Sequence, residues 1–392
     1  MLEQAPADAI KPQSTCLTIA LLLIAGACSA AELPALQGPL RIGTTTIHLV
    51  DRSRRDPVHN DRPRELMVQL WYPIDSSRSH TFAPYLPSER LPAAFAEQKD
   101  SHIPAQTIQS WLGIRTHATL DAKVRRHRRF PLLTFSTGLG LSRASYTTIL
   151  SEVASHGYIV AAIDHPYGGL TVLPDGRTLS IDDDPHSTDD DRAREWAADI
   201  RFVISSLLTF DAFAPAIEGT QIGSFGHSSG GAAALEAARL DPRIAAACDM
   251  DGGVFGGVAE NGVPKPFLIM RSQPVYSDAD LAKLGRTRKQ WQEMGAKARA
   301  LFQPVFDKYP EIPKFQIQIA GTGHMSFSDA PFLMPEMLTR FGGEILSPEK
   351  TLMIVTKYLV AFFDEELQGR RSALLHGDAA PPVSMQIYAS AN

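Results

Sequence analysis

Cysteine is scarce in this sequence, and so are long apolar segments and any excess of basic charge. Three cysteines occur in 392 residues, and only Cys248 lies beyond residue 31. A metal centre built on several cysteines or a disulfide framework is therefore excluded. The chain carries 38 Lys and Arg against 43 Asp and Glu, which argues against general nucleic-acid binding because that needs a basic face. The basic clusters Arg54–Arg55 and Arg125–Arg129 are typical of solvated loops.

The apolar run Cys16–Cys28 contains no charged residue but is thirteen residues long, too short for a membrane-spanning helix, which needs about 20. Small residues follow at 29–31. This pattern predicts a signal peptide over residues 1–31 and a secreted or periplasmic protein, although acidic residues before the run fit such a leader poorly. Two alternatives remain: an envelope lipoprotein attached through Cys28, with Ala25 where that signal usually has Leu, and a buried helix.

Beyond residue 31, apolar runs of strand length alternate with segments of helix length. The strand candidates are Arg41–Val50, Leu66–Ile74, Phe130–Ser136, Tyr158–Asp164, Gln221–Phe225, Ile244–Met250, Phe267–Arg271 and Phe315–Ala320. The helix candidates are Tyr146–Ser155, Asp191–Leu208, Ser229–Leu240, Leu281–Lys308 and Glu349–Leu367. This alternation predicts an α/β fold with a mostly parallel central sheet flanked by helices on both faces. The first two strands have no helix between them, so we expect an antiparallel pair.

We expect a single catalytic domain over residues 32–367. Within it, residues 83–117 mix apolar and polar side chains, which indicates a lid or excursion rather than a second domain. A peripheral membrane contact through the Leu and Phe side chains of this segment is an alternative. The tail over residues 368–392 has few charges and is rich in Ala and Pro, so we expect it to be poorly ordered.

The strongest chemical signal is the G-x-S-x-G motif over Gly226–Gly230. It follows a predicted strand and opens a predicted helix, as a nucleophile elbow does. Such a turn exposes the Ser228 hydroxyl and leaves no room for side chains at the flanking glycines. It also places the backbone N–H of Ser229 at a helix N-terminus, where it can stabilise an oxyanion. A flexible Gly/Ser loop is the alternative reading.

A serine nucleophile needs a base and an acid, which follow it in the order acid then histidine on this kind of scaffold. Downstream histidines are His324, in a small-residue loop after a predicted strand, and His376, in the tail; we favour His324. Asp249 lies at the end of the strand Ile244–Met250 and Asp251 directly follows it. The alternation of side chains along a strand sends both to the same side. Geometry alone leaves both open, and we favour Asp251 because it stands at the strand exit.

A second oxyanion donor is expected from a loop after an early strand. The segment Phe135–Gly140 ends such a strand and contains two glycines that permit close backbone approach. The backbone N–H of Leu139 is our candidate, and a tight structural turn is the alternative. The Gly-x-Gly here lacks the third glycine of a dinucleotide-binding loop.

The chain resembles the platelet-activating factor acetylhydrolase family, the plasma and type II lipoprotein-associated phospholipase A2 group of α/β-hydrolases. The segments that carry the resemblance are Leu66–Pro73, Ala83–Pro87, Phe135–Gly140, Ala154–Ala162, Gly226–Gly231 and Gly323–Phe327. The resemblance implies an α/β-hydrolase fold, with Ser228 as nucleophile, Asp251 as acid and His324 as base. It also implies an oxyanion hole formed by the N–H groups of Leu139 and Ser229. Thr137 and Ser229 depart from the residues common in the family.

These observations predict a serine carboxylic-ester hydrolase that works through an acyl-serine intermediate without a metal or cofactor. The resemblance implies a phospholipid substrate with a short or oxidised sn-2 acyl chain. One alternative is a general short-chain esterase or a dienelactone- or polyester-type hydrolase on the same scaffold. The other is a catalytically silent α/β-hydrolase that acts as a binding protein. Acyl length, head-group preference and oligomeric state are left open.

Overall fold

The structure is a computed structural model that describes residues 32–75, 81–98, 103–186, 188–335 and 346–388. The predicted signal peptide over residues 1–31, including Cys28, lies outside the described residues. Within the described ranges, no helix combines the length and the apolar character needed to cross a membrane.

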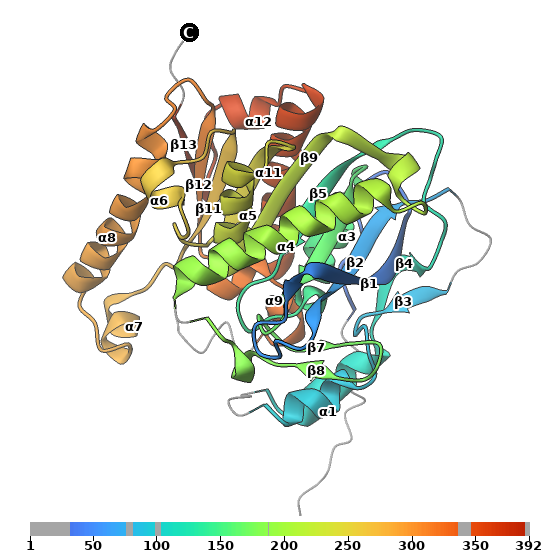
Figure 1. Cartoon of the computed structure of the whole chain (residues 1–392). Coiled ribbons are helices and arrows are strands. Elements are labelled where there is room, and N and C mark those ends of the chain that lie inside the picture. Colours follow the sequence, from blue (N-terminus) through green and yellow to red (C-terminus); the bar gives the residue numbers. More distant parts are fainter. Residues whose placement is uncertain (1–31, 76–80, 99–102, 187, 336–345, 389–392) are drawn as a thin grey trace, which may run out of the picture.

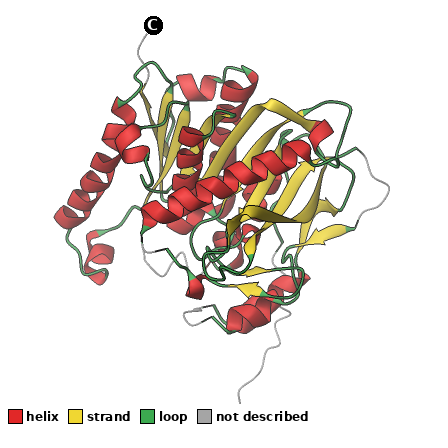
Figure 2. Ribbon diagram, viewed as in Figure 1, coloured by secondary structure: helices red, strands yellow, loops and turns green. Residues whose placement is uncertain are grey.

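One large sheet organises the described part of the chain (Figure 2). In spatial order its strands are β13 (Val383–Tyr388), β12 (Lys314–Ala320), β11 (Phe267–Gln273), β10 (Ile244–Met250), β9 (Ile217–His227), β5 (Phe130–Ser136), β6 (Ile159–Asp164), β2 (Pro63–Pro73), β1 (Ile42–Arg55), β4 (Arg115–Leu120) and β3 (Phe82–Pro84). The six strands from β12 to β6 are parallel to one another, whereas β1 and β2 pair antiparallel. The predicted mostly parallel sheet with an antiparallel entry is confirmed.

Helices cover both faces of this sheet, because alternate side chains of its central strands are apolar on both sides. In β5, Phe130 and Leu132 join one core cluster, and Leu133 and Phe135 join the other. The first cluster includes side chains of α4 (Asp189–Thr209), α5 (Ser229–Leu240), α6 (Val258–Asn261) and α8 (Arg288–Asp307). The second includes side chains of α3 (Thr147–Ser155), α11 (Pro348–Gln368) and α12 (Ala373–His376). Figure 1 shows α4 lying across its face of the sheet.

The long helices begin where the local sequence supplies a cap. The Thr188 hydroxyl accepts a hydrogen bond from the backbone N–H of Asp191, and three aspartates fill the first turn of α4. Their charge is favourable there because the N-terminus of a helix carries the positive end of its dipole. Helix α11 starts at Pro348 after the Ser347 cap and ends at Gln368. It is followed by Gly369, whose φ of 67° is the left-handed conformation common after helices.

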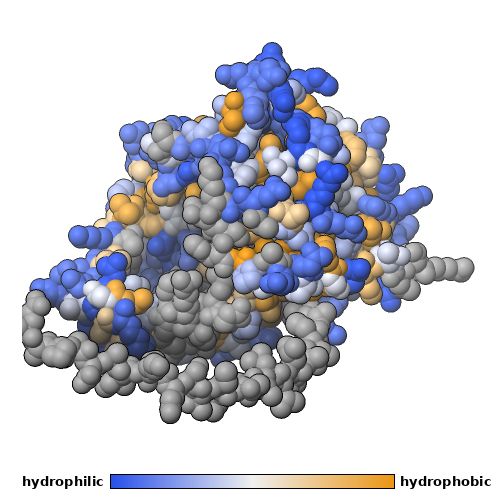
Figure 3. Space-filling view, turned by 90° about the horizontal axis from the view of Figure 1, so that it is seen from below, coloured by the Kyte–Doolittle hydropathy of each residue, from blue (hydrophilic) through white to orange (hydrophobic). Residues whose placement is uncertain are grey.

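Residues 83–98 and 103–117 form an excursion with a small core. Between β3 and β4 lie α1 (Leu91–Ala96) and α2 (Ala105–Ser110). Apolar residues of these helices and of the neighbouring segments form a cluster, which Leu33 and Leu170 join from outside the excursion. Its buried members are Leu33, Tyr85, Leu86, Leu91, Ala94, Ile108, Ile114 and Leu170. Figure 3 views this side of the molecule, which also carries the hairpin of β7 (Thr171–Val172) and β8 (Thr178–Leu179), and hydrophilic residues surround smaller apolar areas on it. Much of the apolar surface of the excursion is thus used in packing.

Two sequence predictions were wrong. The tail expected to be poorly ordered over 368–392 contains α12 and β13, and β13 pairs antiparallel with β12 along six residues. Pairing with a distant strand stabilises this segment, which has little local signal. The single helix expected over Leu281–Lys308 is two, α7 (Asp278–Lys283) and α8, because Gly285 takes a φ of 66° and Thr287 caps a new helix.

Candidate active site

Ser228 occupies the sharp turn between β9 and α5. Its φ of 56° and ψ of −125° are strained for a residue with a side chain. A Cβ atom at Gly226 would lie 2.3 Å from the carbonyl oxygen of Gly230, and one at Gly230 would lie 2.2 Å from that of Ser136. Both glycines are therefore required by backbone packing, as the nucleophile-elbow prediction demands.

The structure brings Ser228, His324 and Asp251 together at the carboxyl ends of the parallel strands. The Ser228 hydroxyl lies 3.0 Å from His324 Nε2, and His324 Nδ1 lies 2.8 Å from Asp251 Oδ2. An ionised carboxylate only accepts hydrogen bonds, so Nδ1–H of His324 donates to Asp251. Nε2 is then unprotonated and accepts the hydrogen bond from the Ser228 hydroxyl. The His324 side chain is 48% exposed and that of Asp251 10%, so solvent reaches the histidine and the carboxylate is sheltered.

Asp251 rather than Asp249 contacts the histidine. Asp251 has a φ of 55°, so it has left the strand conformation and the alternation rule no longer applies to it. Its carboxylate also accepts hydrogen bonds from the backbone N–H and the hydroxyl of Ser272, both at 2.8 Å. Burial by itself raises the pKa of Asp251, but hydrogen bonding and charge from His324 outweigh it and bring the pKa to about 2. The carboxylate stays ionised beside the imidazole.

Asp249 lies in the adjoining interior. Its Oδ1 accepts a hydrogen bond from the Gly252 N–H at 2.8 Å, and its Oδ2 has no partner among the described residues. Burial raises the pKa of Asp249 to about 8. A Cβ atom at Gly231 would lie 1.9 Å from Oδ1, so this carboxyl group packs under the first turn of α5. Asp249 is a packing residue, and its raised pKa favours the protonated form at neutral pH.

The backbone N–H groups of Leu139 and Ser229 lie in segments adjacent to Ser228. Ser229 is the first residue of α5, where N–H groups lack acceptors within the helix. In the other segment, Gly138 N–H donates to Tyr146 Oη at 2.9 Å and Gly140 N–H donates to the Gly168 carbonyl at 2.7 Å. The Leu139 N–H between them has no hydrogen-bond partner among the described residues. Both predicted oxyanion donors are thus available.

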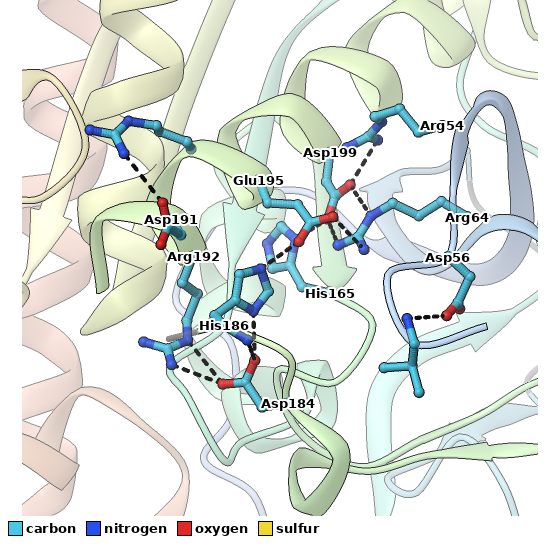
Figure 4. A network of polar contacts seen from close by, with 12 residues as sticks. Arg54, Asp56, Arg64, His165, Asp184, His186, Asp191, Arg192, Glu195 and Asp199 are labelled. Atoms are coloured by element: carbon cyan, nitrogen blue, oxygen red, sulfur yellow. Dashed lines mark hydrogen bonds and ion pairs between the residues drawn. The ribbon is translucent and has the colours of Figure 1, made fainter. Parts of the chain in front are cut away.

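A second serine–histidine–aspartate triplet, which the sequence reasoning missed, lies in the interior. His165 Nε2 lies 3.1 Å from Ser136 Oγ, and His165 Nδ1 lies 2.9 Å from Asp199 Oδ2. Arg64 donates two hydrogen bonds to Asp199, both at 2.7 Å. Figure 4 shows Asp199 between Arg54, Arg64 and His165, with His186 and Glu195 continuing the network.

The other sequence candidates are placed as follows. His376, the alternative base, forms an ion pair with Glu365 on α11 and does not contact Ser228. The sequence reasoning also missed Ser272, whose position at the end of β11, beside the end of β10, was a usable signal. No cluster of three or more His, Cys, Asp or Glu side chains that suits a metal ion occurs in the described ranges.

Most of the chain matches one family of known proteins. Residues 25–168 and 197–378 match the family described as platelet-activating factor acetylhydrolase, isoform II. The chain belongs to this family. Among curated proteins it is similar to a probable 1-alkyl-2-acetylglycerophosphocholine esterase of Arthroderma benhamiae, with 24% identity over 93% of this chain and 96% of the relative. It is also similar to platelet-activating factor acetylhydrolase of Bos taurus, with 21% identity over 82% of this chain and 73% of the relative.

A solved structure gives a higher identity. A ferulic acid esterase from Streptomyces cinnamoneus matches with a TM-score of 0.74 and 30% identity, covering 91% of this chain and all of that chain. The predicted α/β-hydrolase fold and the predicted family are confirmed, and this member of the platelet-activating factor acetylhydrolase family is an ester hydrolase.

Proposed function

We propose that the protein hydrolyses carboxylic esters through an acyl-serine intermediate on Ser228. The observation that carries this proposal is the continuous pair of hydrogen bonds from Ser228 Oγ through His324 to Asp251. In this arrangement Ser228 is the nucleophile and His324 the general base, and Asp251 holds the imidazole in the required tautomer.

The proposed reaction has two stages. Ser228 Oγ attacks the carbonyl carbon of the ester as its proton passes to His324 Nε2, and the oxyanion forms beside the N–H groups of Leu139 and Ser229. The tetrahedral intermediate expels the alcohol, which takes that proton, and leaves an acyl-serine. Water then gives a proton to His324 and attacks the acyl group, and collapse releases the acid as the proton returns to Ser228 Oγ.

The substrate that we propose is a phospholipid with a short or oxidised sn-2 acyl chain. The names of the relatives support the short, acetyl case, since those relatives are an acetylglycerophosphocholine esterase and an acetylhydrolase. A second candidate is the ester of an aromatic acid, favoured by the 30% identity to a ferulic acid esterase. A secreted or periplasmic location remains part of the proposal, with a lipoprotein anchored through Cys28 as the alternative.

The test uses the protein without residues 1–31 and its Ser228→Ala variant. We expect wild type to hydrolyse p-nitrophenyl acetate and Ser228→Ala to lose at least about 10³-fold in kcat. A fluorophosphonate probe is expected to label wild type and Ser136→Ala but not Ser228→Ala. Equal activity of wild type and Ser228→Ala contradicts the proposal, and absence of labelling in folded wild type supports a silent binding protein.

Substrate choice is tested with three esters assayed at matched concentration. These are a 2-acetyl glycerophosphocholine, its 2-palmitoyl analogue, and methyl ferulate. The phospholipid proposal expects the highest kcat/KM on the acetyl phospholipid. A higher kcat/KM on methyl ferulate favours the aromatic-ester candidate, and neither result changes the assignment of Ser228.

A further inference from the structure

His227, the residue before Ser228, is buried and takes no part in the reaction proposed above. Both of its ring nitrogens nevertheless have partners. Nδ1 lies 2.8 Å from Tyr146 Oη, and Nε2 lies 3.0 Å from the carbonyl oxygen of His324. Tyr146 Oη also accepts the Gly138 N–H at 2.9 Å. A chain of three hydrogen bonds therefore runs from the residue before Leu139 to the backbone of His324.

The chemistry of the partners fixes the direction of the two outer bonds, and a neutral imidazole then fixes the middle one. A carbonyl oxygen only accepts, so His227 Nε2 carries a proton and donates it to His324. A backbone N–H only donates, so Gly138 donates to Tyr146 Oη, whose hydroxyl is then free to donate to His227 Nδ1. This arrangement satisfies all groups with a neutral imidazole. Burial, followed by the nearby charge of His324, lowers the pKa of His227 to about 3.

The chain connects the two segments whose separation matters for the reaction. The His227 ring lies 4.5 Å from the His324 ring and 6.1 Å from that of Phe327, measured between centroids. It therefore contacts the short helical turn His324–Phe327 through both its ring and its Nε2–H. At the other end, a Cβ atom at Gly138 would lie 3.0 Å from His227 Nδ1 and 3.0 Å from Tyr146 Oη. A side chain at this position would crowd both the histidine and the tyrosine.

We propose that His227 and Tyr146 are positioning residues that hold the Leu139 loop and the His324 turn at a fixed separation around Ser228 Oγ. This inference rests on the proposed function, because it assigns the two segments as oxyanion loop and base. The hydrogen bonds of His227 also suit its neutral form. A neutral His227 ring places no like charge beside the His324 imidazolium that forms during acylation. A misplacement of about 1 Å in such a site costs about 10²-fold in rate.

Tyr146→Phe removes the hydroxyl and leaves the Gly138 N–H and His227 Nδ1 without their partner. We expect kcat on p-nitrophenyl acetate to fall by about 10- to 100-fold with KM within about 2-fold, since the loss acts on transition-state alignment. Affinity for a trifluoromethyl ketone, which forms a tetrahedral adduct on serine, is expected to fall in parallel with kcat/KM.

The chain supplies a matched control in Tyr158. This tyrosine is also buried, and its hydroxyl donates to Asp364 at 2.6 Å and accepts from Gln368 at 3.0 Å, between β6 and α11. Tyr158→Phe removes the same atom and two hydrogen bonds away from Ser228. We expect it to lower the midpoint of urea unfolding and to leave kcat within about 2-fold.

Two conservative variants of His227 separate the ends of the chain. In His227→Asn the amide oxygen stands near Nδ1 and retains the bond from Tyr146, and in His227→Gln the amide nitrogen stands near Nε2 and retains the bond to His324. We expect the addition of Tyr146→Phe to lower kcat by a larger factor in His227→Asn than in His227→Gln, because the bond to the tyrosine is already lost in His227→Gln. Equal costs in both backgrounds contradict a connected chain.

The outcomes distinguish this inference from the function on which it rests. If Ser228→Ala retains full activity, the proposed function fails. If Ser228→Ala is inactive while Tyr146→Phe, folded as judged by urea unfolding, keeps kcat and inhibitor affinity within 2-fold of wild type, the positioning role alone is overturned. A fall in kcat in Tyr158→Phe as large as that in Tyr146→Phe also overturns the positioning role, because general loosening of the core then explains both results.

Discussion

The triplets Ser228–His324–Asp251 and Ser136–His165–Asp199 use the same three residue types with the same pattern of hydrogen bonds through the histidine. They differ in access and in backbone. The His324 side chain is 48% exposed, whereas Ser136, His165 and Asp199 are all at most 1% exposed. Ser228 stands in a strained turn beside the N–H groups of Leu139 and Ser229, and Ser136 is the last residue of a regular strand.

The charges around the two carboxylates differ as well. Asp251 is bound by the neutral donors of Ser272 and by His324, and the charge of Arg271 acts on it without a hydrogen bond. Asp199 is bound by the guanidinium groups of Arg64 and Arg54. Burial lowers the pKa of His165 and so disfavours its protonated form, and its ring stacks on Trp196 at 4.4 Å between centroids. Hydrogen-bond connectivity alone does not make a site; access and a free oxyanion position are also needed.

The largest expected difference between the triplets comes from their aspartates. Asp251→Asn is expected to lower kcat/KM by about 10³- to 10⁴-fold because it allows the wrong tautomer of His324. Asp199→Asn leaves Arg64 buried without its main counter-charge and is expected to lower the free energy of unfolding by about 3–5 kcal/mol. Ester hydrolysis and urea unfolding measure the two effects, and a folded Asp199→Asn protein with no activity goes against the comparison.

Asp249 and Asp251 give a second comparison, in pH dependence. The pKa of Asp249 in the folded state, about 8, lies above that of an unfolded aspartate, about 4. The folded state therefore holds this proton more tightly, and the resulting stability is complete below about pH 4 and is lost as the pH rises through about 8. We expect the free energy of unfolding of wild type to fall by on the order of a few kcal/mol over this window.

Asp249→Asn is expected to flatten that decline, because the amide keeps the acceptor for Gly252 and does not ionise. Urea unfolding at pH 4, 6 and 8 measures it. The control is Asp61→Asn, at a carboxylate with 79% side-chain exposure. We expect its free energy of unfolding to fall with pH as steeply as that of wild type. If the free energy of unfolding falls equally with pH in wild type and Asp249→Asn, Asp249 does not hold its proton in the folded state.

The smallest expected effect is that of Ser272→Ala. The variant loses the hydroxyl bond to Asp251 Oδ2 and keeps the backbone N–H bond to Oδ1. We expect kcat/KM to fall by about 3- to 10-fold, corresponding to about 1 kcal/mol for one hydrogen bond. Ser206→Ala, which removes a hydroxyl bonded within α4, is the control. If kcat/KM falls no more in Ser272→Ala than in the control, the backbone N–H bond alone is enough to hold Asp251 in place.

The sequence predicted most accurately the elements that have strong local signals. The strands Phe130–Ser136 and Ile244–Met250 and the helix Ser229–Leu240 have the predicted bounds, because continuous apolar runs and a glycine-flanked serine constrain the chain locally. Strand β13 was missed because its stability comes from β12, which is distant in the sequence. The buried triplet was missed for a related reason, since nothing local in the sequence connects His165 to Asp199.

The sequence by itself determined the order of elements, the family and the three residue types that meet at Ser228, because motifs and hydrophobic patterns are local properties. The tertiary structure decided between Asp249 and Asp251, since a positive φ at Asp251 turns its side chain toward His324. It also decided which serine is accessible and placed His227 between the Leu139 loop and the His324 turn. Those outcomes depend on burial and on contacts between distant segments, which only the packed chain creates.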